Sequence, residues 1–439
     1  MATACGGDEE KDQGTPRSTG DMAPDASVDA HMPDRTREPF DAGPPPEGFE
    51  RQPCAVHDDK RFELAVNEEP PDVAPLAVWP ATSRFGFAFV DRSETCVDAL
   101  YVAELRGGYG NDGPEIATAV DTCSQIERVA LASSKAGWLL ASVDNREPPS
   151  DIWVQRFDPE AEEPGEGHRA SEESAQEGSL ALAFFEDDAA LLAWVARDAR
   201  SGKQRLLARV LDATGEPQGD PVVLDAGERW FFTLPTLSRV GPYMGLAYHR
   251  FDVEGASQAV LELLDPATGE RARPTRVLAE DAGPEPTVAL ATDDEGGAVL
   301  YSRTGGVNGR QLWFQHLDDK GEPAETTTGS AVRGASEPQR IVNAPFRAID
   351  GSIARLPTGY AVVYRALPGG DVESPRIKLQ FLDPAGRTFG DSEVADTTPT
   401  GGRTSVVFSI EGRMVVGWSD RSDSEQTHVQ FARIPCVGG

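Results

Sequence analysis

The chain has 439 residues, of which 39% are hydrophobic, enough for one large repeat fold or for two to three ordinary domains. No apolar run approaches the roughly eighteen residues of a membrane-spanning helix. The 73 acidic and 41 basic residues leave a net charge of −32, which disfavours nucleic acid and anionic lipid surfaces as partners because both attract concentrated positive charge.

The first sixty residues have the composition of a flexible tail. They contain no Leu, Ile, Trp or Tyr, but 14 Asp or Glu and 8 Pro. Such a segment buries too little apolar surface to offset the entropy lost on ordering. We predict a disordered tether over residues 1–54 and one ordered domain over residues 55–439.

The tail opens with Met-Ala-Thr-Ala-Cys-Gly-Gly-Asp, in which small residues precede Cys5. This segment resembles the lipobox of a bacterial lipoprotein, truncated so that no basic start or apolar stretch precedes the cysteine. The resemblance implies lipidation at Cys5 and an extracytoplasmic location. The protein would be a periplasm-facing or surface-exposed outer-membrane lipoprotein, or otherwise a secreted protein.

A short apolar run followed by Asp and a nearby Gly or Pro recurs along the rest of the chain. The aspartates are Asp158, Asp212, Asp265, Asp318 and Asp383, at steps of 54, 53, 53 and 65 residues. The longest step indicates an insertion within residues 326–348. Asp followed closely by Gly favours a turn, because the carboxylate accepts backbone hydrogen bonds and glycine adopts positive φ.

A second, nearly continuous apolar run lies upstream of each turn, which is typical of a strand buried on both faces. Seven such runs begin near residues 86, 137, 190, 244, 297, 360 and 414. A third run precedes each of them, as in 126–131, 286–290 and 405–408, and a weaker fourth run follows the turn, as in 221–224 and 115–120.

Four short strands in a unit of about 53 residues, repeated seven times, indicate an all-β fold, a seven-bladed β-propeller. The last unit lacks its fourth strand, and residues 61–67 have the pattern of one. We therefore predict that this N-terminal strand completes the last blade and closes the ring. The competing arrangements are a two-sheet sandwich and two smaller β domains.

One unit carries the phrases Pro-Thr-Val-Ala-Leu (286–290), Gly-Gly-Ala-Val-Leu-Tyr-Ser (296–302) and Leu-Trp-Phe-Gln-His-Leu-Asp-Asp-Lys-Gly (312–321). This pattern resembles the repeats of secreted and lipid-anchored bacterial β-propeller proteins, over residues 61–436. The resemblance implies an architecture and leaves the activity open.

Four cysteines besides Cys5 allow three disulfide pairings. In the blade model, Cys96 and Cys123 lie side by side in the first blade, and Cys54 lies beside Cys436 where the ring closes. We predict these two disulfides, which are suited to an exported protein.

Sequence signatures of catalysis are absent. The six histidines show no metal-ligand spacing, so neither a metal nor a cofactor is expected. There is no nucleophile elbow or phosphate-binding loop, and the acidic pairs are typical of solvated turns. Trp153 and Trp313 are interpreted as packing between blades rather than as platforms for sugars.

Charged residues follow several of the buried strands. If a ligand binds, we predict that Arg250, Arg303 and Arg365, from three consecutive blades, surround one anionic group, with Asp420 and Arg421 at the same opening. The alternative is a ring of solvated charges that pair among themselves, for example with Asp252.

The sequence as a whole predicts an exported, lipid-anchored and monomeric propeller that acts as a binding module for an anionic glycan or an envelope protein. Membrane contact would occur only through a lipid at Cys5. The alternatives are a hydrolase or lyase acting on an acidic glycan at the loop face and a structural component of the envelope.

Overall fold

The computed structural model describes residues 61–66, 77–78, 85–91, 99–105, 115–121, 126–135, 137–144, 150–158, 165–171, 175–186, 188–198, 200–227, 229–283, 287–304, 310–324, 338–341, 347–367, 375–396, 404–408, 413–421 and 427–435; for some strand residues it describes the backbone alone. The chain divides into two units, Met1–Asp41 and Ala42–Gly439. Every described residue belongs to the second unit. The predicted tether, residues 1–54, lies outside the described residues.

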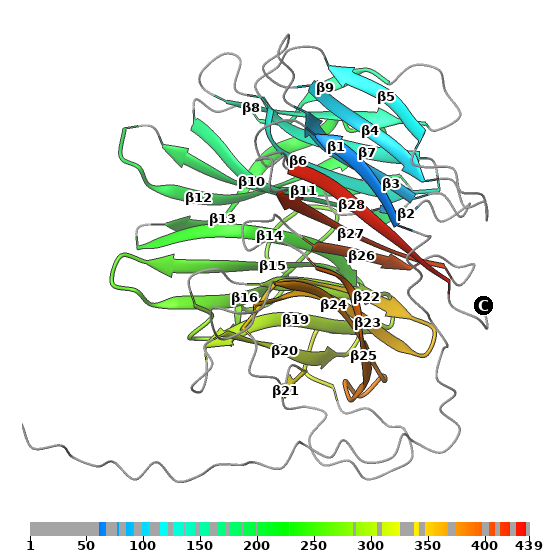
Figure 1. Ribbon diagram of the computed structural model, residues 1–439. Coiled ribbons are helices and arrows are strands. Elements are labelled where there is room, and N and C mark those ends of the chain that lie inside the picture. Colours follow the sequence, from blue (N-terminus) through cyan, green and yellow to red (C-terminus); the bar gives the residue numbers. More distant parts are fainter. Residues whose placement is uncertain are drawn as a thin grey trace, which may run out of the picture. The chain divides into compact units, whose positions relative to one another are not determined.

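The described residues form seven four-stranded sheets in which all neighbouring strands are antiparallel (Figure 1). Sheet 1 contains β2 (Ala77–Val78), β3 (Phe85–Asp91), β4 (Ala99–Leu105) and β5 (Glu115–Asp121). Sheet 2 contains β6 (Ile126–Ser134), β7 (Gly137–Asp144), β8 (Asp151–Phe157) and β9 (Gly167–Arg169). Sheet 3 contains β10 (Ala175–Glu186), β11 (Ala189–Asp198), β12 (Gln204–Asp212) and β13 (Pro217–Gly227).

The next three sheets repeat this order. Sheet 4 contains β14 (Trp230–Val240), β15 (Tyr243–Asp252), β16 (Ser257–Leu264) and β17 (Arg276–Ala279). Sheet 5 contains β18 (Val288–Asp293), β19 (Gly296–Thr304), β20 (Arg310–Leu317) and β21 (Gln339–Arg340). Sheet 6 contains β22 (Arg347–Leu356), β23 (Gly359–Leu367), β24 (Arg376–Leu382) and β25 (Thr388–Asp396). The short strand β21 therefore falls inside the predicted insertion.

Sheet 7 is assembled from both ends of the second unit. It contains β26 (Thr404–Phe408), β27 (Arg413–Arg421) and β28 (Thr427–Pro435), and its fourth strand is β1 (Arg61–Val66). Strand β1 pairs antiparallel with β28, from Arg61 opposite Ala432 to Val66 opposite Thr427. The prediction that an N-terminal strand supplies the missing fourth strand is confirmed.

The first strands of successive sheets contact one another. These contacts join β2 to β6, β6 to β10, β10 to β14, β14 to β18, β18 to β22 and β22 to β26, and β26 in turn contacts β2. Antiparallel four-stranded sheets that pack in sequence through their innermost strands are the architecture of a β-propeller. No helix in the described part of the chain is long and apolar enough to cross a membrane.

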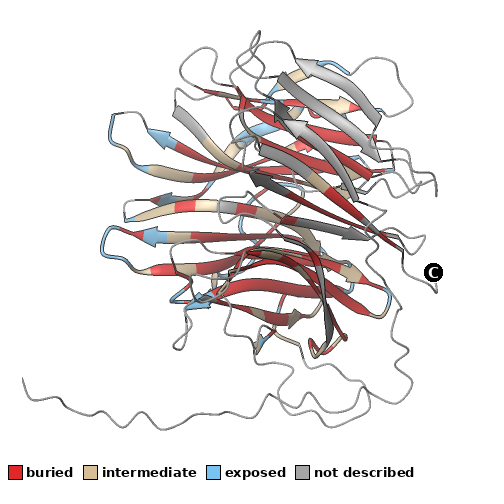
Figure 2. Ribbon diagram, in the orientation of Figure 1, coloured by how far each residue is buried: buried red, intermediate tan, exposed pale blue. Residues whose placement is uncertain are grey.

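The hydrophobic core lies between neighbouring sheets (Figure 2). One cluster, for example, joins Leu191 and Leu206 of sheet 3 to Phe232, Met244 and Tyr248 of sheet 4. Where the second strands are described, side chains on both of their faces are therefore buried, as in β7, in which all eight residues are buried. The continuous apolar runs in the sequence arise from this packing.

The predicted turns form after Asp212, Asp265, Asp318 and Asp383, while the residues that follow Asp158 lie outside the described part of the chain. In the turn after β12, the Oδ1 atom of Asp212 accepts backbone hydrogen bonds from Thr214 and Glu216 at 2.8 and 3.0 Å. Gly215 closes this turn with a φ of 92°. The glycine also allows close packing: in the equivalent turn of sheet 6, a Cβ at Gly386 would collide with the ring of Phe314 in sheet 5. In the four described turns, the closing glycine faces side chains of the preceding sheet.

Candidate functional site

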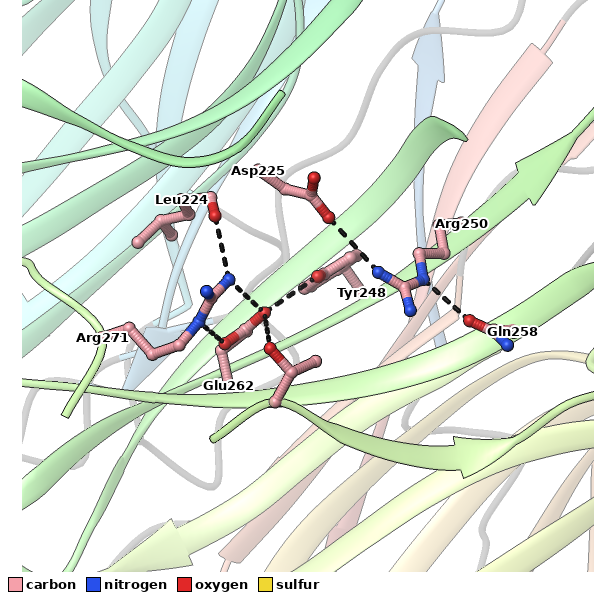
Figure 3. Close-up of polar contacts among 8 residues, drawn as sticks. Leu224, Asp225, Tyr248, Arg250, Gln258, Glu262 and Arg271 are labelled. Atoms are coloured by element: carbon pink, nitrogen blue, oxygen red, sulfur yellow. Dashed lines mark hydrogen bonds and ion pairs between the residues drawn. The ribbon is translucent and has the colours of Figure 1, made fainter. Parts of the chain in front are cut away.

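Arg250 lies in β15 and is held by neighbours from two sheets. Its Nη1 atom lies 3.2 Å from Oδ2 of Asp225 in β13, and its Nε donates to Oε1 of Gln258 in β16 at 2.8 Å (Figure 3). Its guanidinium carbon also lies 4.8 Å from the ring centre of Trp230. Arg250 therefore connects sheet 3 to sheet 4.

Arg303 in β19 has a similar set of partners. Its Nε lies 3.0 Å from Oδ1 of Asp281, and its guanidinium carbon is 5.5 Å from the ring centre of Trp313. The side chains of Arg303 and Asp281 are each 47% exposed, so water screens this ion pair and its contribution to stability is below about 1 kcal/mol.

Arg365 in β23 differs from the other two arginines because its side chain is 0% exposed. Its Nε lies 3.5 Å from Oδ2 of Asp350 in β22. Asp350 has a φ of 53°, and it is the one non-glycine residue with positive φ in the described part of the chain. Its carbonyl oxygen accepts a hydrogen bond from the hydroxyl of Thr404 in sheet 7. This strained position is thus fixed by contacts on both sides.

The strand registers separate the three arginines. Arg250 and Arg303 each lie two residues after a buried tyrosine, Tyr248 or Tyr301, whereas Arg365 directly follows Tyr364. Side chains alternate along a strand, so Arg250 and Arg303 share one side of their sheets and Arg365 projects from the other. The idea that all three surround one anionic group stays a prediction.

The other site residues named in the sequence-based predictions are two charged residues of β27, Asp252 and the five cysteines. Asp420 and Arg421 belong to β27, and their side chains lie outside the described residues. Asp252 pairs with Arg229 at 2.7 Å rather than with any of the three arginines. The cysteines of the predicted lipid anchor and disulfides also lie outside the described residues: Cys5, Cys54, Cys96, Cys123 and Cys436.

A buried polar cluster lies beside Arg250 in sheet 4. The carboxylate of Glu262 in β16 is fully buried and accepts hydrogen bonds from Nε and Nη2 of Arg271 at 2.5 and 2.9 Å. The hydroxyl of Tyr248 also donates to it at 3.1 Å (Figure 3). The hydroxyl of Thr275 donates to it at 2.9 Å. Four donor atoms thus satisfy the buried charge.

Arg271 also extends this cluster to sheet 3. Its Nη2 donates to the carbonyl oxygen of Leu224 in β13 at 2.8 Å. The hydrogen bonds to Glu262 raise the pKa of Arg271 above its ordinary value, and burial followed by the Glu262 charge raises the pKa of Tyr248. Both groups therefore keep their protons, and the cluster acts as a structural link between the two sheets.

The β15–β16 turn presents apolar side chains to solvent. Val253 is 83% exposed and Phe251 is 37% exposed. The ring of Phe251 stacks on Phe231 with centres 5.5 Å apart, and Arg229 lies 5.4 Å from the ring centre of Trp230. We call these five residues, Arg229, Trp230, Phe231, Phe251 and Val253, the sheet 4 tip.

Asp252 fixes the conformation of the sheet 4 tip. Its Oδ1 accepts backbone hydrogen bonds from Glu254 and Ala256 at 3.0 and 2.8 Å, and its Oδ2 accepts one from Nε of Arg229 at 2.8 Å. These hydrogen bonds hold the turn in one conformation.

Acid should weaken this turn. Burial alone would raise the pKa of Asp252, but the hydrogen bonds from Arg229, Ala256 and Glu254 outweigh it and hold the pKa below its ordinary value of 3.8. A lowered pKa in the folded state stabilises the protein above the unfolded pKa, and this stability is lost as the pH falls through the folded pKa. As the pH falls below the ordinary carboxyl pKa of 3.8, the wild type should therefore lose more stability than Asp252→Asn. Thermal unfolding of both proteins across this range measures the difference, and equal losses would contradict this role.

Sequence reasoning missed the sheet 4 tip. The only local signal is the run Arg229-Trp230-Phe231-Phe232, in which consecutive large rings cannot all face one core. Phe232 is buried, whereas its neighbour Phe231 projects toward Phe251. The exposure of Val253 depends on the turn geometry, which the sequence does not reveal.

Comparisons with known proteins concern the fold. No family model matches the chain, and no curated protein matches it. Similar solved structures include a protein of unknown function from Dyadobacter fermentans, with 12% identity and a TM-score of 0.48 over 87% of this chain and 99% of that chain. Another is the β-propeller domain of the Trilobed protease from Pyrococcus furiosus, with 10% identity and a TM-score of 0.46 over 86% and 97%. A third is the α-L-arabinanase of Penicillium chrysogenum, with 12% identity and a TM-score of 0.47 over 74% and 99%.

Proposed function

We propose that this chain is an extracytoplasmic binding module, a seven-bladed propeller that docks an envelope protein at the sheet 4 tip. The seven sheets serve as blades, and β1 closes their ring by completing sheet 7. Pairing of β1 with β28 supports this closure. So does the contact of Phe87 in sheet 1 with Phe431 in sheet 7, whose ring centres are 4.3 Å apart.

The exposure of Val253 on a rigid turn is the observation that carries the binding role. At 83% exposure, the Val253 side chain does not stabilise the folded state by hydrophobic burial, because its apolar surface stays in water. The Asp252 hydrogen bonds hold the turn, so docking Val253 into a partner costs little conformational entropy. Phe251 and Trp230 extend the apolar surface with the residue types found at the centres of protein interfaces.

The charges around the tip favour a protein partner over an anionic ligand. Arg229 already pairs with Asp252 and Glu254, at 2.7 and 3.1 Å, and Arg250 pairs with Asp225. An incoming anion would have to displace these carboxylates on a chain of net charge −32. A protein that covers the apolar residues leaves the ion pairs intact at the rim of the interface.

The proposed location rests on the N-terminal sequence. The small residues before Cys5 and the acidic, Pro-rich stretch after it fit a lipid anchor followed by a flexible tether. We include the pairings Cys54–Cys436 and Cys96–Cys123 in the proposal, because disulfides persist outside the cytoplasm.

The proposal predicts that polar substitutions at the tip abolish partner capture and leave the fold intact. Tagged Phe251→Ser/Val253→Ser protein should recover less of the envelope protein that copurifies with the wild type, by about tenfold or more. Val223→Ser is the matched control, because Val223 is an apolar β-branched residue that is 49% exposed on β13 and is not one of the five tip residues. Equal recovery by a double variant with unchanged thermal stability would contradict the proposed role.

A further inference from the structure

Trp153 in β8 stands apart from the other tryptophans whose side chains are described. Trp138, Trp194 and Trp418 are buried, while Trp230 and Trp313 are partly buried and pack against the cores between sheets 3 and 4 and between sheets 4 and 5. Trp153 is 37% exposed, and the interpretation that it packs between blades stays a prediction, whereas that for Trp313 is confirmed. The exposed part of the indole is accessible to a ligand.

The backbone around Trp153 is rigid. Ile152 and Val154, on either side of it, are fully buried, and β8 is paired with β7 over its whole length. The strand therefore fixes the side of the sheet on which the indole lies, opposite the buried Ile152 and Val154.

Polar groups flank the indole on the same side of the sheet. Arg169 in β9 lies directly opposite Trp153, and its Nη2 donates to Oδ1 of Asp151 at 2.5 Å. The side chains of Arg169 and Asp151 are 47% and 24% exposed. Among the contacts of the described residues, the other guanidinium N–H groups of Arg169 and the second oxygen of Asp151 are not engaged.

Gly167 keeps one edge of the indole open. A Cβ at this position would lie 3.7 Å from Cε3 of Trp153, so any larger side chain would extend along the ring. The absence of a side chain here leaves room for a second flat surface to approach.

We propose that Trp153, Asp151 and Arg169 form a binding site for an uncharged saccharide. The C–H face of a pyranose is apolar and stacks on an indole, while the hydroxyls around its rim each donate and accept hydrogen bonds. The Asp151 carboxylate supplies acceptors and the Arg169 guanidinium supplies donors beside the stacked ring. This site is separate from the sheet 4 tip and does not depend on it.

Charge selects an uncharged saccharide over an acidic one. The Asp151–Arg169 pair has no net charge, because each group neutralises the other at 2.5 Å. The whole chain carries −32, so a polyanionic glycan is repelled at long range. A protein partner is less favoured than a saccharide, since the described apolar surface here is a single ring flanked by charges.

The experiment is calorimetric titration of the full chain with neutral hexasaccharides of glucose (β-1,4 and α-1,4), N-acetylglucosamine, mannose and xylose. Hyaluronan and polygalacturonate fragments serve as acidic comparators. We expect at least one neutral hexasaccharide to bind, with affinity reduced about tenfold or more by Trp153→Ala and only about threefold by Trp153→Phe, which keeps an aromatic surface. Arg169→Ala should also weaken binding.

Two control variants test whether saccharide binding is specific to Trp153 and its neighbours. Val277→Ala removes another exposed apolar side chain and should leave saccharide affinity unchanged. Phe251→Ser/Val253→Ser should also bind saccharide normally, because the tip is a different site. The proposal is overturned if no neutral hexasaccharide binds, if only acidic fragments bind, or if folded Trp153→Ala binds as the wild type does.

Discussion

Replacing Arg271 with methionine should lower the free energy of unfolding by about 2 kcal/mol, because it leaves the Glu262 carboxylate buried without its cation. Breaking a fully buried ion pair costs about 3–5 kcal/mol, but the Arg271 side chain is 37% exposed and water will solvate part of the vacated space. The hydroxyls of Tyr248 and Thr275 remain as donors and moderate the loss. Chemical denaturation at neutral pH measures the change.

Arg303→Met is the matched control for Arg271→Met. Both variants remove an arginine that pairs with one carboxylate, but Asp281 is 47% exposed whereas Glu262 is 0% exposed. The control should lose less than about 1 kcal/mol. Equal losses in the two variants would show that the buried cluster does not link sheets 3 and 4 in the way its geometry indicates.

Replacing Gly241 with alanine should destabilise the protein by about 3 kcal/mol through strain and overpacking. Gly241 lies in the β14–β15 turn with a φ of 56°, and its N–H donates to the carbonyl of Asp293 in sheet 5 at 2.7 Å. A Cβ would collide with the backbone carbonyl of Asp319 in a second turn of the same sheet. Since the neighbour is backbone, a simple rotamer change cannot relieve the collision.

Gly219→Ala is the control that separates the cost of the collision at Gly241 from the cost of placing alanine at positive φ. Gly219 also has positive φ, at 71°, but nothing lies within 4 Å of its would-be Cβ. It should therefore lose only the conformational cost, about 1 kcal/mol. If the two alanine variants unfold at the same denaturant concentration, the close approach of sheets 4 and 5 at Gly241 does not contribute to the free energy of unfolding.

The strands were predictable because a second strand buried on both faces needs a continuous apolar run, and seven such runs recur. The partner of β28 was predictable for a related reason. The last unit lacks a fourth strand, and residues 61–67 alone have the required pattern near the other end of the domain. Repetition thus makes long-range pairing visible in a single sequence.

The surroundings of the three arginines were only partly predictable from the sequence. Arg365 follows its strand tyrosine by one residue rather than two, and this offset places it in a buried position beside Asp350. The offset can be read from the sequence once the tyrosines are aligned. The carboxylate partner of each arginine comes from a different strand or sheet, and its identity requires the structure.

The Glu262 cluster has a sequence signal of its own. A polar residue stands three positions before the turn aspartate in five units, as Gln155, Arg209, Glu262, Gln315 and Gln380. In sheets 2 and 3 this residue bonds to a backbone carbonyl just before or within the fourth strand, as Gln155 does to Gly165 and Arg209 does to Gly219. The pattern predicts a repeated structural link, but only the fold shows that Glu262 recruits Arg271.

The central claim is that the sheet 4 tip binds an envelope protein, and crosslinking from position 253 in living cells tests it most directly. A photoreactive phenylalanine analogue at position 253 should give a discrete protein adduct on irradiation. The same analogue at position 223, an exposed site on β13, should not. Adding Phe251→Ser should weaken the adduct, since it removes the aromatic surface beside Val253. No adduct from position 253, or the same adducts from both positions, would contradict the account.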